Sequence, residues 1–294
     1  MSRIHSIAIL GLMAGLMMLA SCEQEVGNDS DGVLPGVFSV SATQKVHFSQ
    51  GNLQYKASTN TWRFAEHQYD YVGRDNSNIS SSNSGWIDLF GWGTSGWNSG
   101  AVCYQPWSIS TSWMDYYPGG SNSISLTGAY AAADWAWHNA IRNGGNIVHQ
   151  WRTLTHDEWD YLLNTRTDAA SKRGTGNIDG VGGLIILPDN WTLPSGCPQF
   201  NPGFASSYRD WLRNSYTYSQ WTQMEDAGAV FLPAAARRNG TTVYDVGSDG
   251  FYWASTYYNG GDAYSMYFQS NELYATGRYN RHSGLSVRPV RVVR

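Results

Sequence analysis

The stretch that decides the fold is FYWASTYYNGGDAYSMYFQSNELYATGRYNRHSGLSVRPVR, residues 251–291. Within it, residues 264–269 alternate strictly, which is the period of a β-strand. One face of this strand carries Tyr264, Met266 and Phe268, and the other carries Ser265, Tyr267 and Gln269. After a turn at residues 270–271, Leu273 returns to the inner face. The pattern therefore predicts a β-hairpin whose inner face packs against the domain.

The outer face of this hairpin and its flanking loop are rich in tyrosine and small polar residues. Such mixtures resemble antibody paratopes, because tyrosine offers a large contact area with few rotatable bonds. We therefore predict a ligand-binding patch here. Its residues are Tyr257, Tyr258, Asn259, Asp262, Ser265, Tyr267, Gln269, Glu272, Tyr274, Thr276, Arg278, Tyr279 and His282. Two alternatives are a tyrosine-covered strand face that only pairs across strands, and a surface that docks onto another envelope protein.

The closing segment, residues 284–294, predicts an architectural strand. Val287 and Val290 can face inward, while Arg288 and Arg291 pair with acids or bind carbonyl groups. A strand is expected over 285–293. Further strands are expected at 184–187, 229–234 and 251–256, a hairpin within 37–64 and helices at 131–142, 155–163 and 219–226. Few helices among many short strands indicate a single domain of the α+β class.

The first residues read as an export signal. Arg3 provides a positive start, and residues 7–20 form an apolar run that is too short to span a membrane. The run ends in Leu-Ala-Ser-Cys, which resembles a bacterial lipobox. We expect residues 1–21 to be a lipoprotein signal peptide and Cys22 to carry the lipid. An ordinary signal peptide with an incidental cysteine is the alternative.

Residues 22–36 are rich in Glu, Asp, Asn, Ser and Gly and predict an acidic flexible tether before a domain at 37–294. An acidic stretch after a lipidated cysteine accompanies transfer to the cell surface in some bacterial groups. We therefore expect an outer-membrane lipoprotein that faces the cell exterior. A soluble spacer is the plainer interpretation.

Composition excludes some classes of partner. The net charge is −4, charged residues make up 14% of the chain, and there is no basic run, which argues against nucleic acid. The 14 tryptophans and 19 tyrosines predict a strongly aromatic core. After removal of the signal, Cys103 and Cys197 remain; they could form one disulfide or stay as free thiols.

Two motifs carry a resemblance to known families. QWRTLTHDEWDY, residues 150–161, resembles a signature of the formylglycine-generating enzyme superfamily. YWAST at 252–256 and GLSVRPVR at 284–291 resemble the closing motifs of bacterial lipoproteins with the Fibrobacter succinogenes major paralogous domain. The resemblance covers most of residues 37–294 and implies a C-type-lectin-like fold. It also implies that the C-terminal hairpin and loop form the ligand-facing surface.

The motifs for metal chemistry in these families are missing. Copper-binding members use two cysteines near the C-terminus, and no cysteine follows Cys197. The mature histidines lack the H-x-x-x-H spacing of iron-binding members, and the calcium motifs of lectins are absent. We expect no metal, no cofactor and no enzymatic activity. A carbohydrate-processing enzyme or accessory protein of the cell envelope, built on a carboxylate pair, is the alternative.

Some relatives implied by the resemblance are diversified by retroelements at outward positions of this hairpin. The scattered Tyr, Asn, Asp, Ser and His residues fit that pattern, and they fit a fixed patch equally. The sequence thus predicts a lipid-anchored, surface-displayed adhesin or receptor-like protein that recognises a glycan or protein ligand.

Overall fold

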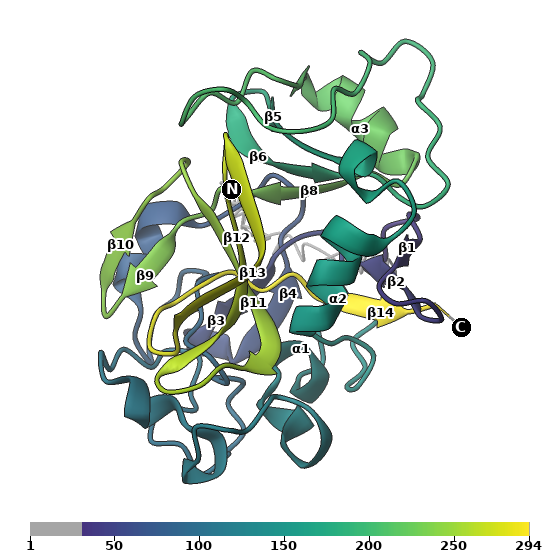
Figure 1. Ribbon diagram of the computed structural model, residues 1–294. Helices are drawn as coiled ribbons and strands as arrows, with labels where there is room; N and C mark the ends of the chain where they lie inside the picture. The colour runs from purple at the N-terminus through teal and green to yellow at the C-terminus, as the bar shows by residue number, and fades with distance from the viewer. Residues whose placement is uncertain (1–30, 294) are drawn as a thin grey trace, which may run out of the picture.

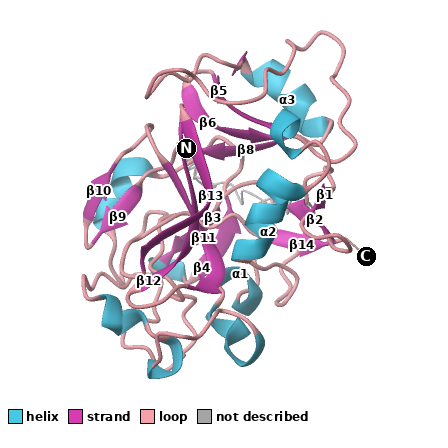
Figure 2. Cartoon of the chain, in the orientation of Figure 1, coloured by secondary structure: helices cyan, strands magenta, loops and turns pink. Residues whose placement is uncertain are grey.

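The computed structural model describes residues 31–293, which form a mixed α+β arrangement. Short strands in several small sheets are joined by long loops, and the α-helices are few and short (Figure 2). The predicted signal peptide, the lipidated Cys22 and most of the predicted tether lie outside the described residues. Within residues 31–293, no helix combines the length and the hydropathy needed to cross a bilayer.

The predicted C-terminal hairpin is confirmed and forms the centre of the molecule. Strands β11 (Gly250–Tyr257), β12 (Asp262–Gln269) and β13 (Glu272–Asn280) make an antiparallel three-stranded sheet (Figure 1). Both faces of this sheet are packed. Met266 and Phe268 join one hydrophobic cluster, whereas Phe251 and Trp253 join a second cluster on the opposite face.

The ends of the described chain meet in a second sheet. Strand β2 (Lys45–Phe48) lies between β1 (Phe38–Ser39) and β14 (Val290–Val292). Val287 and Val290 are fully buried, as predicted. The expected strand over 285–293 is shorter than predicted. Residues 284–289 are extended but make only isolated bridges, such as Leu285 to Phe90, since they cross between sheets.

Arg288 and Arg291 behave as the sequence predicted. The buried Arg288 guanidinium donates to the Phe231 carbonyl oxygen at 3.3 Å and to Gln68 Oε1 at 2.9 Å. The partly exposed Arg291 pairs with Asp31 at 2.7 Å.

A third sheet covers one end of the molecule. Its strand order is β7-β5-β6-β8, and the segments are β5 (Arg173–Ile178), β6 (Val181–Ile186), β7 (Ser215–Tyr216) and β8 (Val230–Pro233). Helix α3 (Tyr218–Asp226) buries Trp221 and Met224 beside it. Strands β5 and β7 had no counterpart in the sequence predictions, because the Gly-rich run of β5 lacks the expected aliphatic pattern.

Two hairpins complete the strands. Strands β3 (Leu53–Lys56) and β4 (Thr61–Phe64) pair across the turn at residues 57–60, as predicted. Strands β9 (Arg237–Asn239) and β10 (Thr242–Tyr244) pair beside the central sheet, on the side away from helix α2 (His156–Asp160) (Figure 1).

The helix predictions are confirmed in part. Thr155 and Glu158 form the expected capping box at the start of α2, and a π-turn carries the helix on through Tyr161–Thr165. The helix predicted over 131–142 is wrong. A 3₁₀ segment is followed by the single turn α1 (Trp135–His138), because Asp134 is extended and caps Ala136 N at 3.0 Å. The 3₁₀ segments are Ala57–Thr59, Gly73–Asn78, Trp113–Tyr116, Pro118–Gly120, Gly128–Ala133 and Ala169–Lys172.

The domain begins earlier than the predicted boundary at residue 37. Leu34 is buried, and its N–H donates to the Phe48 carbonyl oxygen at 3.0 Å. Val33 bridges to Ser49. Residues 31–36, predicted as tether, are therefore part of the packed body, because β2 offers them backbone partners.

The disulfide considered between Cys103 and Cys197 is not formed. Both cysteines are free and partly exposed. Cys197 packs against the α3 region, where its thiol donates to the Gln220 carbonyl oxygen at 3.6 Å, whereas the Cys103 N–H pairs with Asp115 in a different loop.

Asp88 gives the fold a specific pH dependence. It is fully buried, and burial raises its pKa to about 6 even though Val72 N and Asn76 donate to it. The folded state therefore binds the Asp88 proton more tightly than the unfolded state does. The Asp88 contribution to stability should rise as pH falls from 7 to 5, by about 1 kcal/mol.

The measurement is urea unfolding of wild type and Asp88→Asn at both pH values. The variant lacks this titration, so the difference in unfolding free energy between the two proteins should change by that amount. The comparison with the variant is needed because burial lowers the pKa of His138 and His282. Their contribution to stability therefore falls as the pH falls, opposite to that of Asp88. Parallel pH profiles for the two proteins would contradict the prediction.

Candidate functional site

The central sheet divides many of the predicted ligand-binding residues between its two faces. Tyr267 lies opposite Tyr274, and Gln269 lies opposite Glu272, so these four share the face that carries Phe251. Tyr264 lies opposite Arg278 and Asp262 lies opposite Asn280 on the other face. The predicted patch is thus two separate surfaces. Alternation along a strand shows which side chains share a face, but it does not show which face is exposed.

We call the first surface the tyrosine platform; it comprises Tyr208, Tyr244, Tyr267, Tyr274 and Tyr279. The Tyr267 ring stacks on Phe251 at 4.7 Å and on Tyr274 at 5.8 Å, measured between ring centroids. Tyr274 is the most open of these, with 53% of its surface exposed. The exposed Tyr274 ring therefore lies on a stack of rings that continues through Tyr267 to Phe251 in the buried cluster.

Asp249 fixes one side of the platform. It is buried and accepts hydrogen bonds from Tyr208 Oη at 2.9 Å, Gln269 Nε2 at 3.1 Å and Tyr267 Oη at 3.4 Å. Burial, together with the charge of Asp249, raises the pKa of Tyr267 well above its usual value, so its phenol stays neutral. This one carboxylate thus holds two side chains of β12 and one from the loop that carries Tyr208.

Arg237 fixes the other side. Its guanidinium pairs with Asp245 at 2.8 Å and lies over Tyr244 and Tyr279, at 4.8 and 5.6 Å from the ring centroids. Tyr208 and Tyr244 were not predicted as site residues. They come from a loop and from β10, and no pattern in those segments shows that they contact the hairpin.

The second surface lies between the hairpin and the start of α2. Arg278 lies over the Tyr258 ring at 4.7 Å, Tyr258 packs edge-on against Tyr264, and Tyr264 contacts His156 at 3.9 Å between ring centroids. These contacts tie the hairpin to the helix. Tyr257, Asn259 and Thr276 are exposed, and the Asn280 amide donates to the Asp262 carboxylate.

Two predicted residues do not reach the surface. Ser265 is only 2% exposed, because the second hydrophobic cluster covers its end of the sheet. His282 is 9% exposed in the turn after β13, and burial lowers its pKa. Direct contact with a large ligand is therefore excluded for Ser265 in this conformation and restricted for His282.

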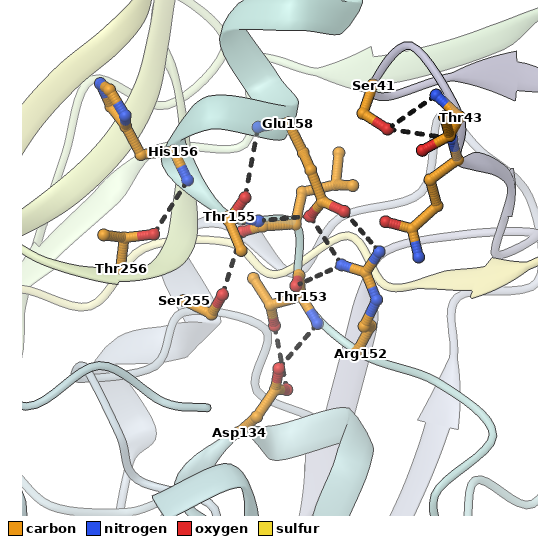
Figure 3. Close-up of polar contacts among 12 residues, drawn as sticks. Ser41, Thr43, Asp134, Arg152, Thr153, Thr155, His156, Glu158, Ser255 and Thr256 are labelled. Atoms are coloured by element: carbon orange, nitrogen blue, oxygen red, sulfur yellow. Dashed lines mark hydrogen bonds and ion pairs between the residues drawn. The ribbon is translucent and has the colours of Figure 1, made fainter. Parts of the chain in front are cut away.

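A cavity of about 400 Å³ lies beside α2. Figure 3 shows polar side chains of this region, among them Asp134, Arg152 and Glu158. Trp137 of α1 lines it, together with Asp134, Thr153, Arg152 and Glu158. No residue of this cavity belongs to the predicted ligand-binding set. The segment QWRTLTHDE could have indicated this cavity from the sequence. Its polar side chains were interpreted only as a helix-capping pattern.

The carboxylates of this cavity are already engaged. Asp134 accepts from Thr153 N at 2.7 Å, from Thr153 Oγ1 at 3.0 Å and from Ala136 N at 3.0 Å. Glu158 accepts from Thr155 N at 2.8 Å and forms a two-point ion pair with Arg152, one contact being 2.7 Å. Burial raises the pKa of Asp134.

Each carboxylate therefore uses three of its roughly four acceptor positions. A hydrolytic pair needs one group free to deliver a proton and another free to attack or to activate water. The bonds that hold Asp134 and Glu158 favour a fixed hydrogen-bonding surface over hydrolysis.

Among residues 31–293, no group of three or more His, Cys, Asp or Glu side chains is arranged to hold a metal ion. Comparison of the chain with models of protein families, with curated proteins and with solved structures found no match.

Proposed function

We propose that this protein is a non-catalytic binding protein that recognises a glycan or a protein ligand through its tyrosine-rich C-terminal hairpin. The observation that carries the proposal is the tyrosine platform. Tyr274 is exposed, yet its ring stacks on Tyr267, which in turn stacks on Phe251, so binding would cost little conformational entropy. Such rings can stack on sugars or fill hollows in a protein.

The proposed location is the cell surface. The signal at residues 1–21 and the cysteine at position 22 support a lipid anchor in the outer membrane, with the domain facing the exterior. Membership of the Fibrobacter-type lipoprotein family, with its C-type-lectin-like fold, is part of the same proposal. So is diversification of the exposed positions, such as Tyr274 and Thr276.

The test is binding by the platform variants Tyr208→Ala and Tyr274→Ala. The full chain in mild detergent would be screened on a glycan array and against purified envelope proteins of the host organism. Removal of either ring should weaken binding of the ligand found by about tenfold or more, because aromatic anchors contribute most at the centre of an interface. Thermal unfolding of Tyr274→Ala should stay close to wild type, whereas Tyr208→Ala should lose a little stability with its hydrogen bond to the buried Asp249.

Tyr218→Ala is the matched control. Tyr218 is 48% exposed and also packs on a tyrosine, Tyr69, but it belongs to α3. Its removal should leave binding unchanged. Equal binding by wild type, Tyr208→Ala and Tyr274→Ala would refute the role of the platform.

A further inference from the structure

The cavity beside α2 is built from five separate parts of the chain. Asp134 and Trp137 come from the α1 turn, Arg152 to Glu158 from the start of α2, and Ser255 from β11. Gln44 from the β1–β2 turn and Thr127 from a loop close its rim. From this arrangement we infer that the cavity binds one sugar ring of an uncharged glycan. The site shares no residue with the tyrosine platform and is independent of it.

The aromatic wall is Trp137. Its indole is partly exposed and is supported by His149, at 5.0 Å between ring centroids. It also borders a neighbouring cavity of about 410 Å³, so part of the ring remains open. An indole held in this way offers the flat apolar surface that the C–H groups of a sugar ring require. A volume of about 400 Å³ suits one or two such rings.

The polar groups around Trp137 suit hydroxyl groups. The Gln44 amide and the Thr127 hydroxyl have no hydrogen-bond partner within residues 31–293, and the Ser255 hydroxyl makes only a 3.5 Å contact with the Leu154 carbonyl oxygen. Asp134 and Glu158 each keep about one acceptor position. The cavity thus offers both donors and acceptors, which is what a sugar hydroxyl needs because it is itself donor and acceptor.

The charge of the lining selects among sugars. Two carboxylates, Asp134 and Glu158, face one guanidinium, that of Arg152, so the lining is net negative when Asp134 is ionised. Arg152 is already bound by Glu158 through both terminal nitrogens. An acidic sugar would meet repulsion without a free cation to pair with. The preference is therefore for neutral sugars over acidic ones.

The test uses the full chain in mild detergent, labelled with 5-fluorotryptophan, and ¹⁹F NMR. The resonance of Trp137 is identified as the one missing in Trp137→Phe. The probes are methyl cellobioside, mannobiose and xylobiose as neutral sugars, with glucuronic acid as the acidic one. At least one neutral disaccharide should shift the Trp137 resonance with a Kd of about 0.1–10 mM, which is usual for a single small polar ligand. Glucuronic acid should shift it less, because the lining is net negative.

Variants separate a binding role from a structural one. Trp137→Ala, measured by calorimetric titration because it lacks the reporter resonance, should bind the neutral sugar about tenfold or more weakly, as expected for loss of an aromatic anchor. The rim variant Gln44→Ala should weaken it by a smaller factor. Trp113→Ala is the matched control, since Trp113 is 40% exposed and lies outside the cavity.

Three outcomes would overturn the inference. One is no shift of Trp137 with any neutral disaccharide at concentrations of about 20 mM, well above the expected Kd. Another is unchanged sugar affinity in Trp137→Ala together with Gln44→Ala. The third is stronger binding of glucuronic acid than of every neutral probe. Failure of the platform variants Tyr208→Ala and Tyr274→Ala would leave all of these results unaffected.

Discussion

Replacement of Arg288 by alanine is expected to lower the free energy of unfolding by about 3–5 kcal/mol, because it leaves a cavity and removes a donor from buried acceptors. Arg288 is 1% exposed and burial lowers its pKa to about 10, so it stays charged at neutral pH. Its loss would leave the Phe231 carbonyl oxygen and Gln68 Oε1 with fewer donors and would open a hole under β14. Chemical denaturation measures the effect.

Two further variants test whether burial of Arg288 causes this loss of stability. Arg288→Met fills most of the volume and should lose less stability than Arg288→Ala. Arg291→Ala removes an arginine three positions along the same segment, but its pair with Asp31 is partly exposed. It should cost at most about 1 kcal/mol. Similar losses for Arg288→Ala and Arg291→Ala would show that burial does not set the difference.

Replacement of Glu158 by alanine is expected to cost about 3–4 kcal/mol. Glu158 combines two roles, since it binds Arg152 at two points and caps Thr155 N at the start of α2. Without Glu158, the half-buried Arg152 guanidinium loses its counter-charge. This loss accounts for most of the expected decrease in the free energy of unfolding. The measurement is urea unfolding of Glu158→Ala, with helix content followed by circular dichroism.

The two roles can be separated. Glu158→Gln keeps an acceptor for Thr155 N and should lose mainly the charge interaction. Thr155→Ala removes only the other half of the capping box and should cost about 1 kcal/mol. In Arg152→Ala with Glu158→Ala, the loss should be smaller than the sum of the single losses, because no charge is left unpaired. Additive losses would contradict a coupled pair.

Local patterns predicted the local structure well. The alternation at 264–269 found β12, T-x-x-E found the start of α2, and the aliphatic and arginine positions of the closing segment found its buried and paired side chains. These features are set by neighbours in the sequence, so they can be read from it. The same holds for the turn between β3 and β4.

The sequence could not predict which surfaces stay open. Ser265 and Tyr267 share a face, but the second hydrophobic cluster covers Ser265 and leaves Tyr267 partly exposed. Tyr208 reaches the platform only through Asp249, and Trp137 meets Thr127 only in the folded chain. Burial of this kind depends on contacts between distant segments, which neither periodicity nor composition encodes.

The position of β2 between β1 and β14 also determines the order in which this fold can be completed. The backbone partner of residues 46–48 is found more than 240 positions later in the chain. While the protein is being made, that edge of β2 must wait until nearly all of residues 31–293 have emerged, and such distant pairing is slow. Closure of this sheet is therefore a late step, which is compatible with the export that we propose.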